Sequence, residues 1–356
     1  MKDRHICSEC LNDTSVRNIS FDENGRCSRC ASYAAKRAEL TDYERLEQLF
    51  CERIERVRGK YDYDAVVGIS GGKDSVYLLY QLIHKYKLHV KAFTMLNGFF
   101  SDEARANVDS IVKEFGVEHE YIEYDEKLLK TFYHYSMKHW LVPCIACSYI
   151  GYATMINYTS KVNAGMCIHG RSPEQMFRAY GNDVFTGLVD AGLRSIYEID
   201  LNELYSSLLG SIGEKLDGEL MKYTNEMLTK DIDKGDFREF VAYFLYHEYR
   251  EKDIVAFLRE NTTWTPPSEY NHYDCTVHNA TKYIYEIAEG RPHALPEISA
   301  LIRMGDISRD EGREMLRDSY VQSVPKDELD YLCKYAGINK QALLLKAKVY
   351  NKFIKK

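Results

Sequence analysis

The sequence predicts an α/β protein in which a parallel sheet is flanked by helices. From residue 64 to about 172, short apolar runs rich in β-branched residues alternate with helical patterns. This alternation is typical of parallel strands joined by helices that cover both faces of the sheet. A glycine-rich turn at 70–75 follows the first apolar run. Because ligands of such sheets bind at the carboxyl ends of the strands, we expect the functional site at that turn.

The turn itself predicts an anion-binding site. Residues 64–80 read DAVVGISGGKDSVYLLY, with a strand candidate at 65–69 and a helical pattern from 76 to 82. The two glycines allow close approach to the backbone, the free amides of the helix start point outward, and the helix dipole favours negative charge. The turn matches neither G-x-x-x-x-G-K-[ST] nor G-x-G-x-x-G. A simple glycine turn with helix-capping residues is the alternative interpretation.

The six residues SGGKDS resemble the PP-loop of the N-type ATP pyrophosphatases, whose fold is HUP-like. In that family the loop holds the pyrophosphate of ATP, the enzyme attaches AMP to a substrate oxygen, and a nucleophile then expels AMP. The resemblance implies that Lys73 holds the departing pyrophosphate and that Asp74 helps to place Mg²⁺. It also implies that the residues contacting ATP are Ser70, Gly71, Gly72, Lys73, Asp74 and Ser75, with Thr94, Met95 or Asn97 at the end of the second strand.

The composition is that of an ordinary soluble protein. Its 356 residues are 45% hydrophobic and 28% charged, enough for one large or two modest domains. There is no run of about 18 or more apolar residues, and the polar N-terminus is unlike a signal peptide, so a cytoplasmic protein without a membrane span is expected. The net charge of −7 argues against a large nucleic-acid footprint, although a local basic patch remains compatible with it. Ten cysteines in such a chain favour metal ligands or catalytic thiols over disulfides.

Four cysteines near the N-terminus predict a zinc module at 1–35. Cys7 and Cys10 form one C-x-x-C pair, Cys27 and Cys30 form another, and sixteen residues separate the pairs. This spacing suits a tetrahedral four-thiolate site, and zinc would replace the core that so short a segment cannot build. Four protein ligands leave the metal no open position, which predicts a structural role. Unrelated buried thiols are the alternative.

The segment 7–33 resembles the N-terminus of the N-acetyl sugar amidotransferases, bacterial PP-loop proteins that help to build amidino sugars of surface polysaccharides. A weaker resemblance covers 299–312. It implies an N-acetylated sugar, usually nucleotide-linked, as the small-molecule acceptor. Because no glutaminase segment is recognisable in this chain, it also implies a separate glutaminase as partner. Within 299–312, Ser308 and Glu311 predict a helix-capping box, while Arg303 and Arg309 either bind an anion or are surface charge.

A second cysteine set predicts a different chemistry. Cys144 and Cys147 follow Pro143 as a further C-x-x-C pair, and Cys275 lies in the Cys/His loop 272–278 beyond a Trp-Thr-Pro-Pro break. Two thiols at this spacing can share a metal or form a redox pair. The stretch resembles both the sugar amidotransferases and the PP-loop tRNA thiolases, and in the thiolases a third cysteine completes the pair into an iron–sulfur site. That resemblance makes the three thiols catalytic candidates and a [4Fe-4S] cluster a candidate cofactor. Buried thiols without chemistry are the alternative.

A fourth strand is expected at 164–169, followed by a loop. The PP-loop resemblance places the glycine of the corresponding loop near ATP, which here is Gly170. Arg171 is a catalytic candidate because a guanidinium stabilises charge that develops on a phosphate oxygen. His169 either faces the α-phosphate or substrate, or is a non-catalytic histidine of the core.

The predicted organisation has five parts. A zinc module at 1–35 and a linker helix at 36–60 precede the PP-loop domain at 61–175. Residues 176–262 show helical spacing at 201–209, 220–227 and 237–245, which predicts a cover for the open side of the sheet or an oligomer contact, such as that of a homodimer. Residues 263–356 hold the Cys/His loop and the terminal helices.

These observations predict an ATP-dependent transferase that adenylates a carbonyl or amide oxygen and replaces AMP with ammonia. The alternative uses the same activation with sulfur as nucleophile, supplied through the second cysteine set or by a sulfur donor protein, and gives a thioamide or a thiolated base. The second cysteine set favours sulfur, whereas 7–33 and 299–312 favour nitrogen. A third hypothesis is a non-catalytic nucleotide sensor or scaffold, against which the intact SGGKDS argues.

Overall fold

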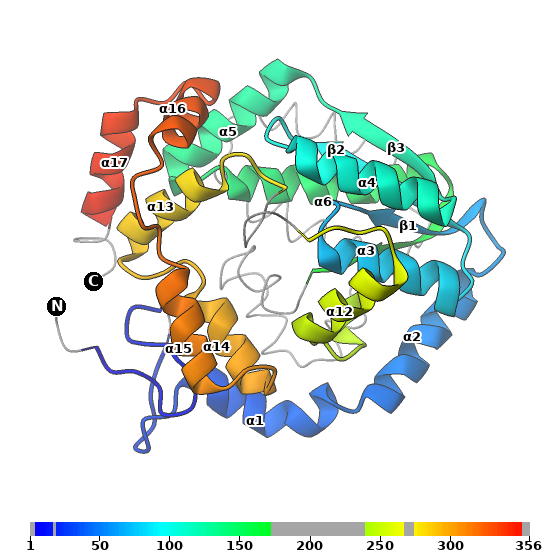
Figure 1. Ribbon diagram of the computed structural model, residues 1–356, viewed down its shortest axis with the longest axis horizontal. Helices are drawn as coiled ribbons and strands as arrows, with labels where there is room; N and C mark the ends of the chain where they lie inside the picture. The colour runs from blue at the N-terminus through cyan, green and yellow to red at the C-terminus, as the bar shows by residue number, and fades with distance from the viewer. Residues whose placement is uncertain (1–3, 17–18, 172–238, 267–273, 351–356) are drawn as a thin grey trace. The chain divides into compact units, whose positions relative to one another are not determined.

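The computed structural model describes residues 4–16, 19–171, 239–266 and 274–350 (Figure 1). Its internal contacts divide the chain into two units. The sheet unit comprises Tyr43–Phe132 and Ile145–Thr276, and the helical unit comprises Met1–Asp42, Tyr133–Cys144 and Val277–Lys356.

The sheet unit is built on a parallel sheet. Within the described ranges its strand order is β3-β2-β1-β4-β5, and every neighbouring pair is parallel. The strands are β1 (Tyr63–Gly68), β2 (Val90–Leu96), β3 (Glu118–Glu123), β4 (Ala164–His169) and β5 (Glu239–Ala242). Their carboxyl ends therefore meet at one edge, with β1 in the middle. The predicted fold class is confirmed.

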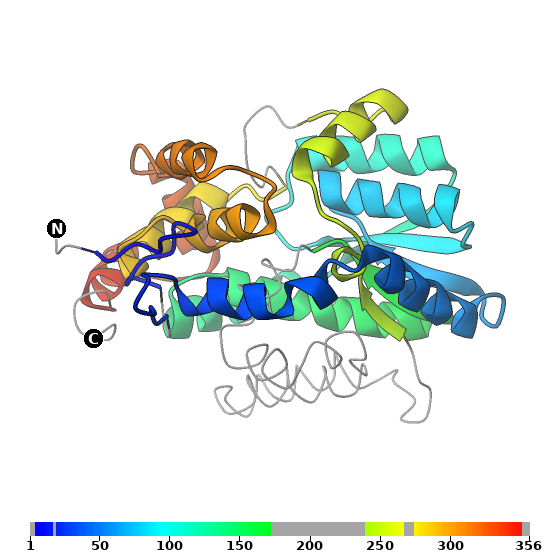
Figure 2. The ribbon, with the colours of Figure 1, turned by 90° about the horizontal axis from the view of Figure 1, so that it is seen from below.

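Helices cover both faces of this sheet. Figure 2 shows α3 (Lys73–Tyr80) and α4 (Asp102–Phe115) on one face, with α2 (Tyr43–Val57) and α6 (Cys144–Lys161) on the other. On the first face, α12 (Glu251–Asn261) packs against α3. Because β1 is covered on both sides, its residues 65–67 have no exposed surface. This double burial is why the segment reads as a continuous apolar run.

The helix predicted at 237–245 is wrong. The structure places β5 at Glu239–Ala242 and only a short 3₁₀ helix at Tyr243–Leu245. All residues of both elements are buried, and a strand covered on both faces cannot be told from a buried helix by periodicity. Glu239 begins this edge strand and receives two hydrogen-bonding partners from α2, Arg53 at 2.6 Å and Arg56 at 3.2 Å. The helices predicted at 201–209 and 220–227 lie outside the described residues.

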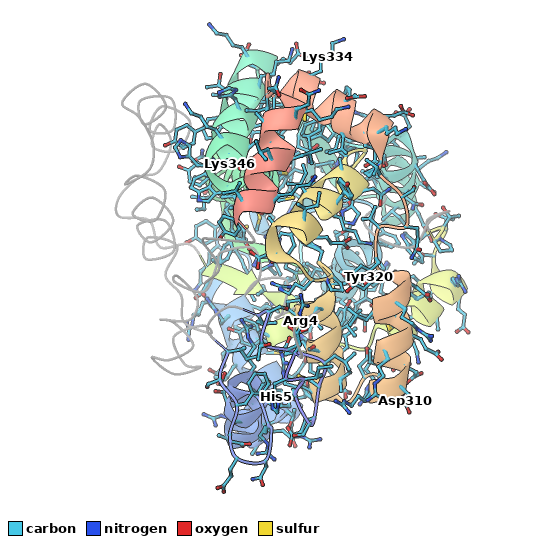
Figure 3. The ribbon with its side chains drawn as sticks, turned by 90° about the vertical axis from the view of Figure 1, so that its left-hand side faces the viewer. Arg4, His5, Asp310, Tyr320, Lys334 and Lys346 are labelled. Atoms are coloured by element: carbon cyan, nitrogen blue, oxygen red, sulfur yellow. The ribbon has the colours of Figure 1, made fainter. Side chains whose placement is uncertain are left out.

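The helical unit combines the N-terminal module with the C-terminal helices. It contains α1 (Ser28–Leu40), the second half of α5 (Glu126–Trp140), α13 (His278–Glu289), α14 (Leu295–Met304), α15 (Arg309–Asp318), α16 (Lys326–Tyr335) and α17 (Lys340–Val349). Figure 3 shows Asp310 on α15, Lys334 on α16 and Lys346 on α17. The predicted capping box is confirmed: the Ser308 hydroxyl accepts from the Glu311 amide, and the Glu311 carboxylate accepts from the Ser308 amide. No helix of the described ranges is both long and apolar enough to cross a membrane.

Candidate functional site

The glycine-rich turn lies where the sequence predicts it, between β1 and α3 at the carboxyl edge of the sheet (Figure 1). Gly71 has a φ of +76°, which glycine adopts without strain. Gly72 is the N-cap of α3 and makes no side-chain cap. The turn thus leads directly into the N-terminus of a helix, where the positive end of the helix dipole favours an anion.

The Ser75 hydroxyl stabilises the turn through two hydrogen bonds to its backbone. It donates to the Gly72 carbonyl at 3.0 Å and accepts from the Ser70 amide at 3.2 Å. The same hydroxyl therefore ties the two ends of the loop together in this structure. Its predicted contact with pyrophosphate stays a prediction.

Four side chains set the charge beside the turn. The Lys73 ammonium lies 3.3 Å from Asp74 Oδ2 and 3.8 Å from Glu251 Oε1, and the Tyr249 hydroxyl donates to Asp74 Oδ1 at 3.1 Å. Burial and the charge of Glu251 raise the pKa of Asp74, and Lys73 and the Tyr249 hydroxyl oppose that rise. Both Asp74 oxygens thus have partners that favour the carboxylate, which is the form that binds Mg²⁺.

Tyr249 and Glu251 were not found from the sequence, because both lie more than 170 residues beyond the turn. Glu251 begins α12, and Tyr249 lies just before it. Only the packing of α12 on α3 brings them to Lys73 and Asp74. The one local signal is the acidic first turn of α12, which by itself indicates a helix start.

The exit of β4 lies directly against the start of α3. A Cβ added to Gly170 would lie 3.0 Å from the Asp74 carbonyl oxygen, a tight contact that the glycine avoids. Next to it, His169 is 5% exposed, and burial lowers its pKa to about 3. Its Nδ1 accepts from the Arg171 amide at 3.3 Å, so the ring is neutral with the hydrogen on Nε2.

Arg171 lies over the Tyr152 ring, with its guanidinium carbon 5.1 Å from the ring centre. Asp274 is close enough to Arg171 and Lys73 for both charges to oppose the rise that burial causes in its pKa. The segment that carries Asp274 is fixed to the exit of β2, because the Ser101 amide donates to the Asp274 carbonyl at 3.3 Å. Arg171, Lys73 and Asp274 therefore share the carboxyl edge of the sheet.

Thr94 is 2% exposed, and its hydroxyl is already engaged. It donates to the Ile69 carbonyl at 2.7 Å and accepts from His119 Nε2 at 2.9 Å. Those bonds join β2 to the end of β1 and to β3. The predicted contact of Thr94 with adenine or ribose stays a prediction, and the bonds give this side chain a structural role.

Two of the second cysteine set lie at the loop that leaves β2. Cys147 Sγ accepts from Asn97 Nδ2 at 3.4 Å, and Cys275 pairs with Phe100 in an antiparallel bridge. Both thiols are partly exposed. Cys144 is exposed at the start of α6 and belongs to the helical unit, so the predicted gathering of all three thiols stays a prediction.

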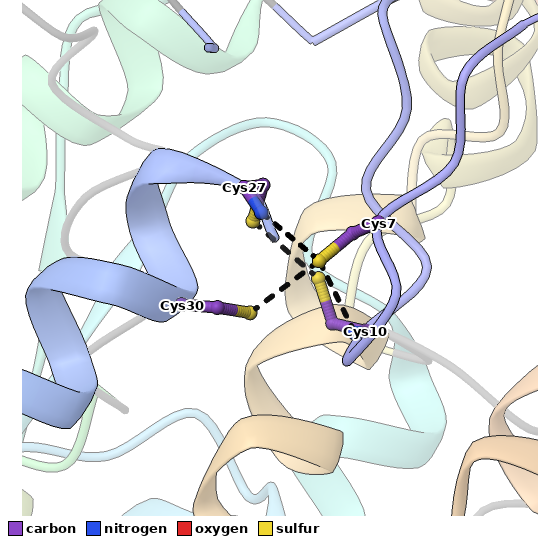
Figure 4. Close-up of side chains that lie close together, drawn as sticks. All are labelled: Cys7, Cys10, Cys27 and Cys30. Carbon is purple, nitrogen blue, oxygen red and sulfur yellow. Dashed lines mark hydrogen bonds between the residues drawn. The ribbon is translucent and has the colours of Figure 1, made fainter. Parts of the chain in front are cut away.

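The four N-terminal cysteines lie close enough together to hold one metal ion (Figure 4). Their Sγ atoms all lie within 4.8 Å of one another and are buried. The pairs Cys7–Cys30 and Cys10–Cys27 are each 3.8 Å apart. A tetrahedral zinc ion with Zn–S bonds of about 2.3 Å would hold its sulfurs about 3.8 Å apart, so the thiols fit one such ion. The thiols of a four-iron cluster bind different irons and would lie farther apart.

The four thiols of this site do not share one protonation tendency. The hydrogen bond to Cys27 and burial raise the pKa of Cys10 to about 11, whereas hydrogen bonds from Cys10 and Cys30 lower the pKa of Cys27. A dication would replace the protons and hold the thiolates together. Backbone amides of Glu9, Cys10 and Cys27 already donate to Cys7 Sγ at 3.2–3.5 Å, as they would to a metal-bound thiolate.

Arg303 and Arg309 face this metal site. Arg309 donates to the Cys7 carbonyl at 2.7 Å and to the Cys10 carbonyl at 3.2 Å. Arg303 Nη1 lies 4.0 Å from Cys10 Sγ, and Ile302 packs against the cysteines. The structure thus places both arginines beside the four cysteines, where they would offset the negative charge of metal-bound thiolates.

Comparisons with known proteins find only distant likenesses. No family model matches the chain, and no curated protein matches its sequence. Among solved structures, the chain is similar to the U34-tRNA thiolase NcsA from Methanococcus maripaludis with its [4Fe-4S] cluster, at 14% identity and a TM-score of 0.36, covering 89% of this chain and 90% of that one.

Two shorter structures also match. One is the NH3-dependent NAD synthetase from Campylobacter jejuni, at 14% identity and a TM-score of 0.32, covering 56% of this chain and 100% of that one. The other is NMN synthetase from Francisella tularensis, at 12% identity and a TM-score of 0.30, covering 52% of this chain and 93% of that one. Likenesses this distant carry no argument, and the assignment of function rests on the residues of this chain.

Proposed function

We propose that this protein is an ATP-dependent transferase that adenylates a carbonyl or amide oxygen of its acceptor and then replaces AMP with ammonia. The observation that carries this proposal is the SGGKDS turn at the carboxyl edge of a parallel sheet, with the uncapped N-terminus of α3 behind it. The resemblance of that turn to the PP-loop supplies the reaction class. The resemblance of 7–33 and 299–312 to sugar amidotransferases favours an N-acetylated sugar as acceptor and a separate glutaminase as the source of ammonia.

In the first step, adenylation of the acceptor, we assign a separate role to each of the charged residues at the loop. The acceptor oxygen forms a bond to the α-phosphorus, the bond between the α- and β-phosphates breaks, and pyrophosphate leaves with the electron pair. Lys73 and the amides at the start of α3 would bind the pyrophosphate, because they present positive charge and hydrogen-bond donors. Arg171 would offset charge on the α-phosphate. Mg²⁺ bound to the nucleotide would supply further charge neutralisation, with Asp74 as its protein ligand.

In the second step ammonia adds to the activated carbon. AMP then leaves with the former carbonyl oxygen, and an N-acetyl group becomes an amidine after loss of protons to solvent. Adenylation is needed because an amide oxygen is a poor leaving group. The four-cysteine site has no open ligand position and would serve this chemistry only by holding the N-terminal module together.

The test measures whether the carbonyl oxygen of the acceptor is transferred to AMP. With an acceptor labelled with ¹⁸O at its carbonyl, ammonium and ATP, we expect AMP that carries the label, together with pyrophosphate and no ADP. A Lys73→Gln variant should lose this activity by about 100-fold, as a transition-state contact does, whereas Lys130→Gln on the exposed face of α5 should keep it. Formation of ADP, or of unlabelled AMP, would contradict adenylation of that oxygen.

The second candidate is the same activation with sulfur as nucleophile. The observation that favours it is the position of Cys147 and Cys275 at the loop that leaves β2. A persulfide on one of these thiols, loaded by a sulfur donor protein, would attack the adenylated carbon and expel AMP. A second thiol would then break the S–S bond, which releases the thioamide or thiolated base and leaves a disulfide for an external thiol to reduce. A persulfide-bearing sulfur donor together with a reducing thiol, in place of ammonium, should then support turnover, and Cys147→Ser and Cys275→Ser should abolish it. If ammonia-dependent turnover survives both substitutions, the nucleophile is ammonia and the sulfur-transfer candidate is contradicted.

A further inference from the structure

The indole of Trp264 contacts the backbone of the candidate nucleotide loop. Its Nε1–H donates to the Gly71 carbonyl oxygen at 2.9 Å, and the side chain is 4% exposed. A single neutral hydrogen bond would be unremarkable elsewhere. Here it fixes the peptide that joins the two consecutive glycines of the loop.

That peptide decides where the loop presents a donor. In a planar trans peptide the C=O of one residue and the N–H of the next point in opposite directions. Because Trp264 holds the Gly71 carbonyl on its own side, the Gly72 N–H must point away from Trp264. Gly72 is the N-cap of α3, and within the described ranges its N–H donates to no protein acceptor.

The orientation of this peptide has to be fixed by an outside contact, because both residues that it joins are glycines. Turning it over would change ψ of Gly71 and φ of Gly72, and glycine tolerates both sets of angles. A flipped peptide would point a carbonyl oxygen where the N–H now points, and an oxygen there would repel a phosphate. The freedom that lets the loop approach a phosphate closely also allows it to take the wrong orientation.

Trp264 is anchored independently of the loop. Its own amide donates to Thr262 Oγ1 at 3.1 Å. The next residue, Thr265, is tied to Asn107 of α4 through its amide, hydroxyl and carbonyl, at distances of 2.9–3.2 Å. Thr263 reaches Glu114, a further residue of α4. The segment 262–265 thus runs along α4 and delivers the indole to Gly71.

From this geometry we infer that Trp264 is a positioning residue, which keeps the Gly72 N–H turned toward the pyrophosphate group of a bound nucleotide. The inference rests on the proposed function for the identity of the ligand, but the orientation of the peptide is a property of the free protein. Trp264 contacts the loop through the Gly71 carbonyl. It acts through the backbone of the loop.

The chain has only two tryptophans, Trp264 and Trp140, so the test uses the Trp140→Phe protein, whose only indole is Trp264. In this full-length protein we would replace Trp264 either with a fluorotryptophan, which keeps the N–H, or with benzothienylalanine, which has the same shape and lacks it. Binding of Mg²⁺-pyrophosphate and of Mg²⁺-ATP would be measured by calorimetry. We expect wild-type affinity with fluorotryptophan and about fivefold weaker binding of both ligands with benzothienylalanine, the size of one lost neutral hydrogen bond.

Because the two replacements pack alike, a purely structural role of the ring would affect neither affinity. Equal affinities would therefore overturn the inference. If a Trp264→Phe variant fails to fold, the comparison of the fluorotryptophan and benzothienylalanine proteins still tests the inference.

A second measurement does not depend on the ligand. The ¹H–¹⁵N indole resonance of Trp264 should exchange slowly with solvent in the free protein, as expected for a buried, bonded N–H. It should also shift on addition of pyrophosphate. Rapid exchange would show that the hydrogen bond from Trp264 to Gly71 is absent, which would overturn the inference. Slow exchange without any binding of pyrophosphate or ATP would contradict the proposed function but not this hydrogen bond.

Discussion

Gly71 offers a sharp test of how the loop is packed. An alanine there would adopt a φ of +76°, which disfavours any Cβ by about 1–2 kcal/mol. Its Cβ would also lie 2.6 Å from the Ala104 carbonyl oxygen of α4. Backbone cannot move aside as a side-chain end can, so overpacking adds about 1–3 kcal/mol. We therefore expect Gly71→Ala to lower the free energy of unfolding by about 2–5 kcal/mol.

Gly116 provides the matched control. It has a φ of +61°, and an added Cβ would find nothing within 4 Å. Gly116→Ala should thus lose only the backbone contribution, about 1–2 kcal/mol. Urea unfolding followed by circular dichroism measures both variants. Equal losses would refute the packing of α4 behind the loop, and with it the argument that the loop has a single shape before nucleotide binds.

Three further predictions follow from individual contacts. His169→Asn keeps an acceptor for the Arg171 amide but removes a buried group whose pKa is lowered to about 3 from 6.5. Since the unfolded chain takes up that proton below pH 6.5, the wild type loses stability on acidification, and the variant should lose about 2 kcal/mol less between pH 6.5 and 5 in urea titrations. Arg309→Gln should speed metal release to a chromogenic chelator by about tenfold, whereas Arg313→Gln on the exposed side of α15 should not. Tyr249→Phe removes a bond that lowers the pKa of Asp74, so the acid limb of pyrophosphate release should move to higher pH; an unmoved limb would exclude Asp74 as the titrating group.

The position of the loop was predictable because its determinants are local. A strand buried on both faces, two glycines and a helix start follow one another within 64–80, and no distant residue is needed to recognise them. The four-cysteine site was predictable for the same reason, since two C-x-x-C pairs carry the geometry of a tetrahedral ion in their spacing.

What the sequence did not reveal depends on packing between distant segments. Trp264 reaches Gly71 across 193 positions, and Tyr249 reaches Asp74 across 175. Neither contact leaves a periodic signal, because each depends on where α12 and the segment 262–265 lie on α3 and α4. The helix prediction over Glu239–Ala242, where the structure has a strand, was wrong for a related reason. Complete burial removes the alternation of apolar and polar residues that distinguishes a strand from a helix.

The two stretches that resemble sugar amidotransferases outside the loop turn out to be neighbours in space. Arg309 holds the carbonyls of Cys7 and Cys10, Ile302 packs on the cysteines, and Arg303 lies beside Cys10. Gly312 makes this possible, because a Cβ there would come within 2.6 Å of Ile302 Cδ1, where α15 packs on α14. One packed module around a metal site therefore accounts for both stretches. It follows that these residues need not touch the acceptor, and that the groups that choose the acceptor should be sought at the carboxyl edge of the sheet, around Arg171 and Asp274.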